Sequence, residues 1–121
     1  MKTIVAVDDD VASLDILNEM LSEKAVELRS FESSSEAMAF VRSTSDPIDL
    51  FLIDVKLHEN NGLSMLKELK ESGKEYSKSP VVMVSAIATS FYKDKAIALG
   101  AADCFMKPFE DLDLLKLLED I

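Results

Sequence analysis

The fold of this chain follows from one stretch, Asp49-Leu-Phe-Leu-Ile-Asp-Val-Lys-Leu-His-Glu-Asn-Asn-Gly62. Its four apolar residues, Leu50 to Ile53, end at Asp54, and a polar turn follows. A short apolar run bounded by polar residues is typical of a strand buried on both faces of a parallel sheet. Ligands bind at the carboxyl ends of such strands. We therefore expect Asp54 to lie in a binding site.

Four further segments have the length and composition of strands. Two are rich in apolar residues, which indicates burial, and one, residues 103–106, is a short strand. Residues 26–31 alternate apolar and polar side chains, which favours an edge strand. The predicted strands are Thr3–Val7, Val26–Phe31, Leu50–Asp54, Val81–Val84 and Asp103–Met106.

Each of these strands is followed by a segment that is predicted to be helical, in most cases because apolar residues recur at helical spacing. Ser33 and Glu36 have the spacing of a capping box, and Gly100 is a helix stop signal. The predicted helices run from Val11 to about Lys24, from Ser33 to before Asp46-Pro47, from Leu63 to about Ser72, from Ser90 to Leu99, and from Leu112 onward; residues 73–79 are expected to form a loop. Five strands alternating with five helices predict a doubly wound α/β fold, a parallel sheet covered on both faces.

Length and charge limit the classes of function. A chain of 121 residues suits one domain, residues 1–121. The net charge of −10 argues against direct nucleic-acid binding, because no basic patch can neutralise phosphates. No apolar run approaches the roughly 20 residues of a membrane span, and Thr3–Val7 is too short for a signal peptide. With Cys104 as the only cysteine, we expect no internal disulfide and a cytoplasmic location.

Four of the five predicted strands end in polar side chains of the kind that form binding sites. The first gives Asp8 and Asp9, the third Asp54, the fourth Ser85 and the fifth Lys107. If all strands are parallel, these ends meet on one rim of the sheet. Carboxylates that lie together raise one another's pKa unless a cation compensates their charge. A few carboxylates completed by waters are the ligands that Mg²⁺ prefers.

Lys107 and Ser85 add an ammonium and a hydroxyl donor to this rim. Together with a divalent cation they would stabilise the charge on a phosphoryl group. A carboxylate can be the nucleophile that forms an aspartyl phosphate. The residues therefore predict that Asp54 is a phosphoacceptor and that Asp8 and Asp9 bind the metal.

The same segments resemble a known family. They are Val7-Asp8-Asp9-Asp10, Leu52-Ile53-Asp54 with Gly62 eight residues later, Val84-Ser85-Ala86, Gly100-Ala101-Ala102-Asp103 and Lys107-Pro108-Phe109. In this order and spacing, the chain resembles a response-regulator receiver domain over its whole length. The resemblance implies a three-layer, flavodoxin-like fold whose sheet has the strand order 2-1-3-4-5.

The resemblance also implies a function for each site residue. It implies Mg²⁺-dependent transfer of a phosphoryl group to Asp54 from the phosphohistidine of a sensor histidine kinase or a phosphotransfer protein. By position, Asp9, Asp54 and the main-chain carbonyl of Lys56 would ligate Mg²⁺, and Asp8 would contact it mainly through water. Ser85 and Lys107 would contact the phosphoryl oxygens.

Its other partners would be a downstream target protein or a fused output domain, and a second copy of the chain after phosphorylation. A receiver is a signalling module and not an enzyme.

The chain departs from the family pattern at three positions. Cys104 stands where the family usually has an aromatic residue, three positions before the lysine. In the family this aromatic side chain turns inward when the domain switches. Phe91 and Phe105 are the candidates to take its place in this chain. His58 stands where a proline is common, and Ser85 replaces a commoner threonine but keeps the hydroxyl.

Several residues also have purely structural interpretations. Asp8 to Asp10 could serve only as acids at a helix N-terminus. We expect Cys104 to be a small buried filler and Met20, Met38, Met65, Met83 and Met106 to lie in the core. We also predict that Lys56 affects the lifetime of the phosphorylated state, so Lys56→Ala should change the dephosphorylation rate.

Three other functions compete with a phosphorylated receiver. An aspartyl-phosphate phosphohydrolase would keep its nucleophile in a D-x-D pattern after the first strand with a nearby threonine, but Ala12 and Ser13 follow Asp10 here. A flavodoxin-like electron carrier would need donors for the flavin phosphate where this chain has three aspartates. A receiver-like module that binds partners without phosphorylation would not need Asp9, Asp54 and Lys107 together.

Overall fold

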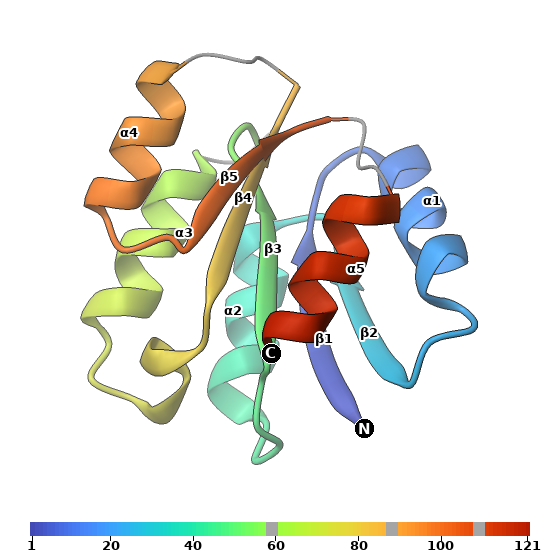
Figure 1. Ribbon diagram of the computed structural model, residues 1–121. Helices are drawn as coiled ribbons and strands as arrows, with labels where there is room; N and C mark the ends of the chain where they lie inside the picture. The colour runs from blue at the N-terminus through green and yellow to red at the C-terminus, as the bar shows by residue number, and fades with distance from the viewer. Residues whose placement is uncertain (58–60, 87–89, 108–110) are drawn as a thin grey trace.

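Five parallel strands form one sheet at the centre of the molecule (Figure 1). The computed structural model describes residues 1–57, 61–86, 90–107 and 111–121. The strand order is β2-β1-β3-β4-β5, and every neighbouring pair is parallel. The strands are β1 (Lys2–Val7), β2 (Val26–Phe31), β3 (Leu50–Asp54), β4 (Val81–Ser85) and β5 (Asp103–Met106). The predicted flavodoxin-like order, with residues 26–31 at an edge, is confirmed.

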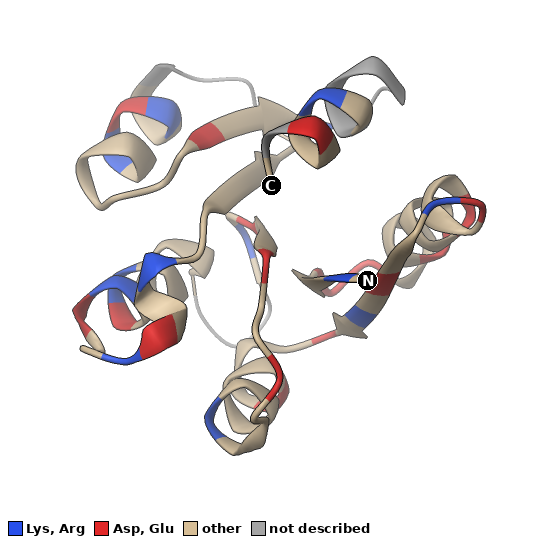
Figure 2. Ribbon diagram, turned by 60° about the horizontal axis from the view of Figure 1, so that its bottom comes forward, with Lys and Arg blue, Asp and Glu red and all other residues tan. Residues whose placement is uncertain are grey.

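Helices cover both faces of this sheet (Figure 1 and Figure 2). They are α1 (Val11–Leu21), α2 (Ser34–Ser43), α3 (Gly62–Glu71), α4 (Ser90–Ala98) and α5 (Asp111–Asp120). Residues of α2, α3 and α4 form one apolar core with one face of the sheet, and residues of α1 and α5 pack on the other. The three-layer α/β architecture is therefore as predicted.

The central strand explains why two cores exist. All five residues of β3 are buried. Phe51 and Ile53 enter the core beneath α2 and α3, whereas Leu50 and Leu52 enter the core beneath α1. Because successive strand residues point to opposite faces, an unbroken apolar run supplies both cores. Asp54 continues this run at the carboxyl end of β3, where the strand leaves the core.

Some element boundaries differ from the sequence-based expectation. Helix α1 ends at Leu21 instead of about Lys24. The expected loop at residues 73–79 contains a 3₁₀ helix, η1 (Glu75–Lys78). Lys70 Nζ donates to the carbonyls of Ser77, at 3.1 Å, and Ser79, at 2.8 Å. These two hydrogen bonds from a side chain of α3 explain why a polar segment is ordered there.

Two predicted helix signals act as expected. The Ser33 hydroxyl accepts a hydrogen bond from the Glu36 amide at 3.2 Å and caps α2. Gly100 has φ +107°, a conformation that residues with a side chain rarely adopt, and it follows the end of α4.

The methionines divide between core and surface. Met38, Met65 and Met83 are buried, and Met20 packs beside the α1 core. The prediction was wrong for Met106, whose side chain is 55% exposed. Met106 is the last residue of β5, an edge strand, so the core does not cover it there.

Among the described residues, no helix combines the length and the apolar character needed to cross a membrane.

Candidate functional site

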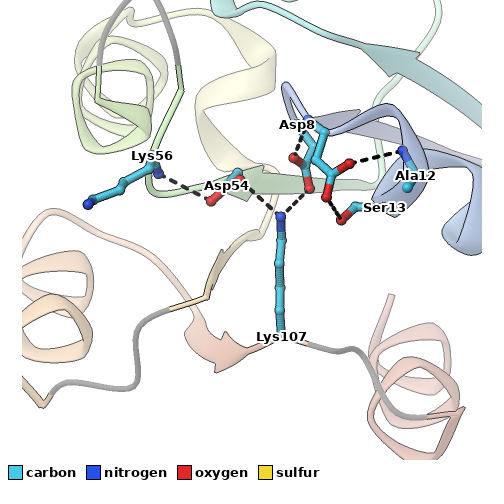
Figure 3. Close-up of polar contacts among 7 residues, drawn as sticks. Asp8, Ala12, Ser13, Asp54, Lys56 and Lys107 are labelled. Carbon is cyan, nitrogen blue, oxygen red and sulfur yellow. Dashed lines mark hydrogen bonds and ion pairs between the residues drawn. The ribbon is translucent and has the colours of Figure 1, made fainter.

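Three strand ends bring the charged side chains of the site together (Figure 3). Asp8 follows β1, Asp54 ends β3 and Lys107 follows β5. The Lys107 ammonium lies between the two carboxylates, 2.5 Å from Asp8 Oδ2 and 3.0 Å from Asp54 Oδ2. Asp8 and Asp54 are each only 8% exposed. A buried ion triad thus joins three strands at the carboxyl rim of the sheet.

Asp9 completes an acidic cluster with these two aspartates. Asp8, Asp9 and Asp54 each offer a carboxylate oxygen, and these oxygens all lie within 4.8 Å of one another. Octahedral Mg²⁺, with ligands at about 2.1 Å, places its oxygen ligands roughly 3 to 4 Å apart. The donor set, with oxygen ligands alone, therefore fits a hard divalent cation after small side-chain adjustments.

The backbone fixes the orientation of both buried carboxylates. Asp8 Oδ1 accepts from the Asp10 amide at 2.9 Å, and Asp54 Oδ1 accepts from the Lys56 amide at 3.2 Å. Each aspartate therefore uses one oxygen for a main-chain amide and the other for Lys107.

Asp10 has a different place from its two neighbours. It is the N-cap of α1, where its carboxylate accepts from the Ala12 amide and the Ser13 hydroxyl, each at 3.1 Å. The structural interpretation of the three consecutive aspartates therefore fits Asp10, while Asp8 and Asp9 belong to the acidic cluster.

The pKa values of Asp54 and Lys107 are both raised, but for different reasons. Burial is the main cause that raises the pKa of Asp54; the hydrogen bond from Lys107 opposes it, and the charge of Asp8 adds to it. Burial acts to lower the pKa of Lys107, but its hydrogen bonds to Asp8 and Asp54 outweigh burial and the pKa is raised. Lys107 therefore stays cationic at neutral pH, and its hydrogen bond favours the ionised form of Asp54.

The structure places Ser85 and Lys56 beside this cluster. Ser85 is the buried last residue of β4, and its carbonyl accepts from the Lys107 amide at 2.8 Å. The Lys56 side chain points away from the acidic cluster (Figure 3). Its main chain forms an isolated antiparallel bridge with Asn61. The roles of these residues, including the effect of Lys56 on phosphoryl lifetime, stay predictions.

Cys104 lies half-buried in β5 instead of fully buried, packed against the core beneath α2, α3 and α4. Burial, with the charge of Asp103, raises the pKa of its thiol. Neither of the two aromatic residues proposed as substitutes packs against the same core as Cys104. Phe91 is 63% exposed, and Phe105 packs on the α1 side of the sheet. Tyr92 of α4 packs against the same core as Cys104. Tyr92 is therefore an aromatic residue at this core that was not predicted from the sequence, because only its burial distinguishes it from Phe91.

A cavity of about 310 Å³ adjoins the site. Its lining combines polar side chains with apolar residues of α1 and the sheet. The polar ones are Asp8, Asp10, Ser13, Asp54 and Lys107, and the apolar ones include Leu17 and Leu52. This cavity could not be predicted from the sequence, since it depends on the spacing between α1 and the sheet. His58, Pro108 and Phe109 lie outside the described residues.

Comparisons with known proteins agree with this geometry. A family model described as a response regulator receiver domain matches residues 4–119. The transcriptional regulatory protein CpxR of Klebsiella pneumoniae is 31% identical over 115 residues, which cover 95% of this chain and 47% of that protein. The signal transduction histidine-protein kinase BarA of Escherichia coli is 29% identical over 116 residues, 96% of this chain and 12% of that protein. The chain thus spans half or less of these relatives.

Solved structures match nearly the whole chain. The Vibrio cholerae chemotaxis protein CheY4 superposes with a TM-score of 0.88 at 24% identity, covering 100% of this chain and 98% of that one. A CheY-like receiver domain protein from Methanospirillum hungatei gives 0.86 at 26% identity, covering 99% and 92%. The chain belongs to the response regulator receiver domain family, whose role in two-component systems is a phosphorylation-based switch.

Proposed function

We propose that Asp54 accepts a phosphoryl group in a Mg²⁺-dependent reaction, from the phosphohistidine of a sensor histidine kinase or a phosphotransfer protein. One observation carries the proposal: the Asp54 carboxylate is buried at the centre of the sheet rim, beside two more carboxylates and the Lys107 ammonium. A buried carboxylate with a perturbed pKa and a partner cation is a strong candidate for chemistry.

Each site residue would have a separate role in such a transfer. Asp9, Asp54 and the Lys56 main-chain carbonyl would hold Mg²⁺, with Asp8 contacting it mainly through water. The bound ion would neutralise carboxylate charge and the charge that develops on the phosphoryl oxygens. A carboxylate oxygen of Asp54 forms the new bond to phosphorus while the bond from phosphorus to the donor's imidazole nitrogen breaks, and the imidazole leaves with that electron pair.

Phosphorylation would then change the contacts of Lys107 and Ser85. The phosphoryl group brings about −1.5 to −2 charges to a site that already holds three aspartates. Lys107 would exchange Asp54 for a phosphoryl oxygen, and the Ser85 hydroxyl would approach another. The hydrogen bond from the Lys107 amide to the Ser85 carbonyl links the ends of β4 and β5, so both strands respond together.

This response would reach the surface formed by α4, β5 and α5, and shift the population of a partner-binding state. The partner is a downstream protein or a fused output domain, and a homodimer is a further expected form of the phosphorylated chain. The chemistry of the site stays limited to its own phosphorylation and dephosphorylation.

The proposal is tested by intact-protein mass spectrometry after incubation with acetyl phosphate, with Mg²⁺ and with a chelator. Wild type should gain one phosphoryl group only when Mg²⁺ is present, and Asp54→Asn should gain none. Asp15→Asn, a change on the exposed side of α1, is the matched control and should behave as wild type. A wild type that gains no mass with Mg²⁺, or an Asp54→Asn variant that gains as much as wild type, would overturn the proposal.

A further inference from the structure

Beside the site, the main chain of Gly62, the first residue of α3, lies very close to the main chain of Asp54. A Cβ atom built on Gly62 would lie 1.9 Å from the Asp54 carbonyl oxygen, 2.9 Å from the Asp54 carbonyl carbon and 3.1 Å from Ile53 Cγ2. Gly62 does not have a positive φ; among the described residues only Gly73 and Gly100 do. Position 62 therefore needs glycine for space and not for an unusual backbone conformation.

Several main-chain contacts lock this approach in place. The Gly62 amide donates to the Val55 carbonyl at 2.7 Å, and Lys56 and Asn61 form an antiparallel bridge. Asn61 caps α3 by accepting from the Leu63 amide at 2.8 Å. The first turn of α3 is thus attached to the two residues that follow Asp54.

The strand that carries Asp54 is held on both of its edges. The strand β3 is paired with β1 on one side and β4 on the other, with Val7 opposite Ile53 and Val84 opposite Asp54. The Val55 amide also donates to the Val84 carbonyl at 2.9 Å. Any side chain at position 62 must therefore displace α3 and the segment that carries Lys56, and not the central strand.

We propose that Gly62 is a positioning residue of the phosphoacceptor site: its missing side chain lets α3 close against Asp54 and so sets where the Lys56 main-chain carbonyl lies. This inference rests on the proposed function. The atom that a Cβ would meet is main chain, so it cannot rotate away. Real Cβ contacts do not fall below 3.0 Å, so a methyl group that starts at 1.9 Å forces a shift of about 1.1 Å.

A shift of this size matters because Mg²⁺ demands nearly ideal octahedral geometry. Displacing a residue that supports a metal ligand typically weakens metal affinity by about 10- to 100-fold. A misplacement of about 1 Å can slow a positioned reaction by roughly 100-fold. Gly62 should therefore matter for metal binding even though it has no side chain to offer.

The test compares Gly62→Ala with Gly73→Ala. Gly73 has φ +70° and no atom within 4 Å of its would-be Cβ, so alanine there strains the backbone without meeting Asp54 or its neighbours. Three quantities are measured for each variant. Calorimetric titration gives the Mg²⁺ affinity, incubation with acetyl phosphate gives the phosphorylation rate, and the thermal midpoint reports on folding. Gly62→Ala should bind Mg²⁺ at least about tenfold more weakly and react about 100-fold more slowly. Gly73→Ala should lower the thermal midpoint and leave both other values at the wild-type level.

If Gly62→Ala does not fold, Asn61→Ala takes its place. It removes the cap that holds the first turn of α3 beside Lys56, and it should weaken Mg²⁺ binding in the same direction by a smaller factor. Wild-type Mg²⁺ affinity in a folded Gly62→Ala, or in Asn61→Ala if that is the variant used, would overturn the inference. The Mg²⁺ arm decides it independently of phosphorylation, so a wild type that binds Mg²⁺ but accepts no phosphoryl group would count against the proposed function alone.

Discussion

At the scale of single residues, Lys107 acts as the internal counter-ion of the site. Its ammonium contacts Asp8 and Asp54, and all three side chains are at most 18% exposed. Removing one partner of a buried ion cluster leaves an uncompensated charge, which costs more than the cluster itself contributes. The charge balance of the metal-free protein therefore depends on this one lysine.

Lys107→Met, which keeps most of the apolar stem, should destabilise the metal-free protein by about 3 kcal/mol. Saturating Mg²⁺ should recover much of this loss, because a bound cation would compensate the same carboxylates. Urea unfolding with Mg²⁺ and with a chelator measures both values. An equal loss of stability under the two conditions would mean that Lys107 and the metal do not share the acidic cluster.

The raised pKa of Asp54 predicts a dependence of stability on pH. Because the folded state holds this proton more tightly than the unfolded state, stability falls as pH rises from the ordinary value of 3.8 through the folded-state pKa. Asp54→Asn removes that loss, so without Mg²⁺ it should be more stable than wild type at pH 7. The difference in thermal midpoint should shrink as the pH is lowered toward 4, and a difference that stays constant with pH would refute the assignment.

At the scale of elements, the start of α1 places a helix cap next to a proposed metal ligand. Asp10 accepts two hydrogen bonds within the first turn, whereas Asp9 belongs to the acidic cluster. Asp10→Ala should cost about 1 kcal/mol of stability and leave Mg²⁺ affinity unchanged. Asp9→Asn should show the reverse, little loss of stability and a large loss of affinity. Calorimetric titration and urea unfolding of the two variants check this, and a large loss of Mg²⁺ affinity in Asp10→Ala would contradict it.

The elements also explain what could be predicted from the sequence. The run from Leu50 to Ile53 predicts a doubly covered central strand, because only a strand buried on both faces needs apolar side chains at every position. The convergence of Asp8, Asp54 and Lys107 follows once all strands are parallel. Both inferences rely on patterns that are local in sequence.

Features that depend on tertiary contacts could not be predicted in this way. The 3₁₀ helix η1 exists in a polar segment because Lys70, on α3, binds its carbonyls. Met106 resembles a core residue until the edge position of β5 is known. The space requirement at Gly62 arises from a helix start that meets a strand end, and the sequence offers only a glycine at a helix N-terminus.

At the scale of the whole molecule, the two cores share one sheet, so the site is only as rigid as its central strand. Phe51→Ala, three residues before Asp54, should cost about 3–5 kcal/mol because Phe51 is fully buried. Out of a total of about 5–15 kcal/mol for a domain, that is a large fraction. Ile16→Ala, at an exposed position, should change stability by less than about 0.5 kcal/mol. Urea unfolding compares the two, and equal effects would contradict the description of the core.

The central claim is that the phosphoryl group is carried by Asp54. Borohydride reduces an acyl phosphate to an alcohol, which marks the modified residue permanently. After incubation with acetyl phosphate and Mg²⁺, reduction and peptide mass mapping should find the mark at position 54 alone. A mark at Asp8 or Asp9, or no mark in protein that binds Mg²⁺, would contradict the assignment of Asp54 as the phosphoacceptor.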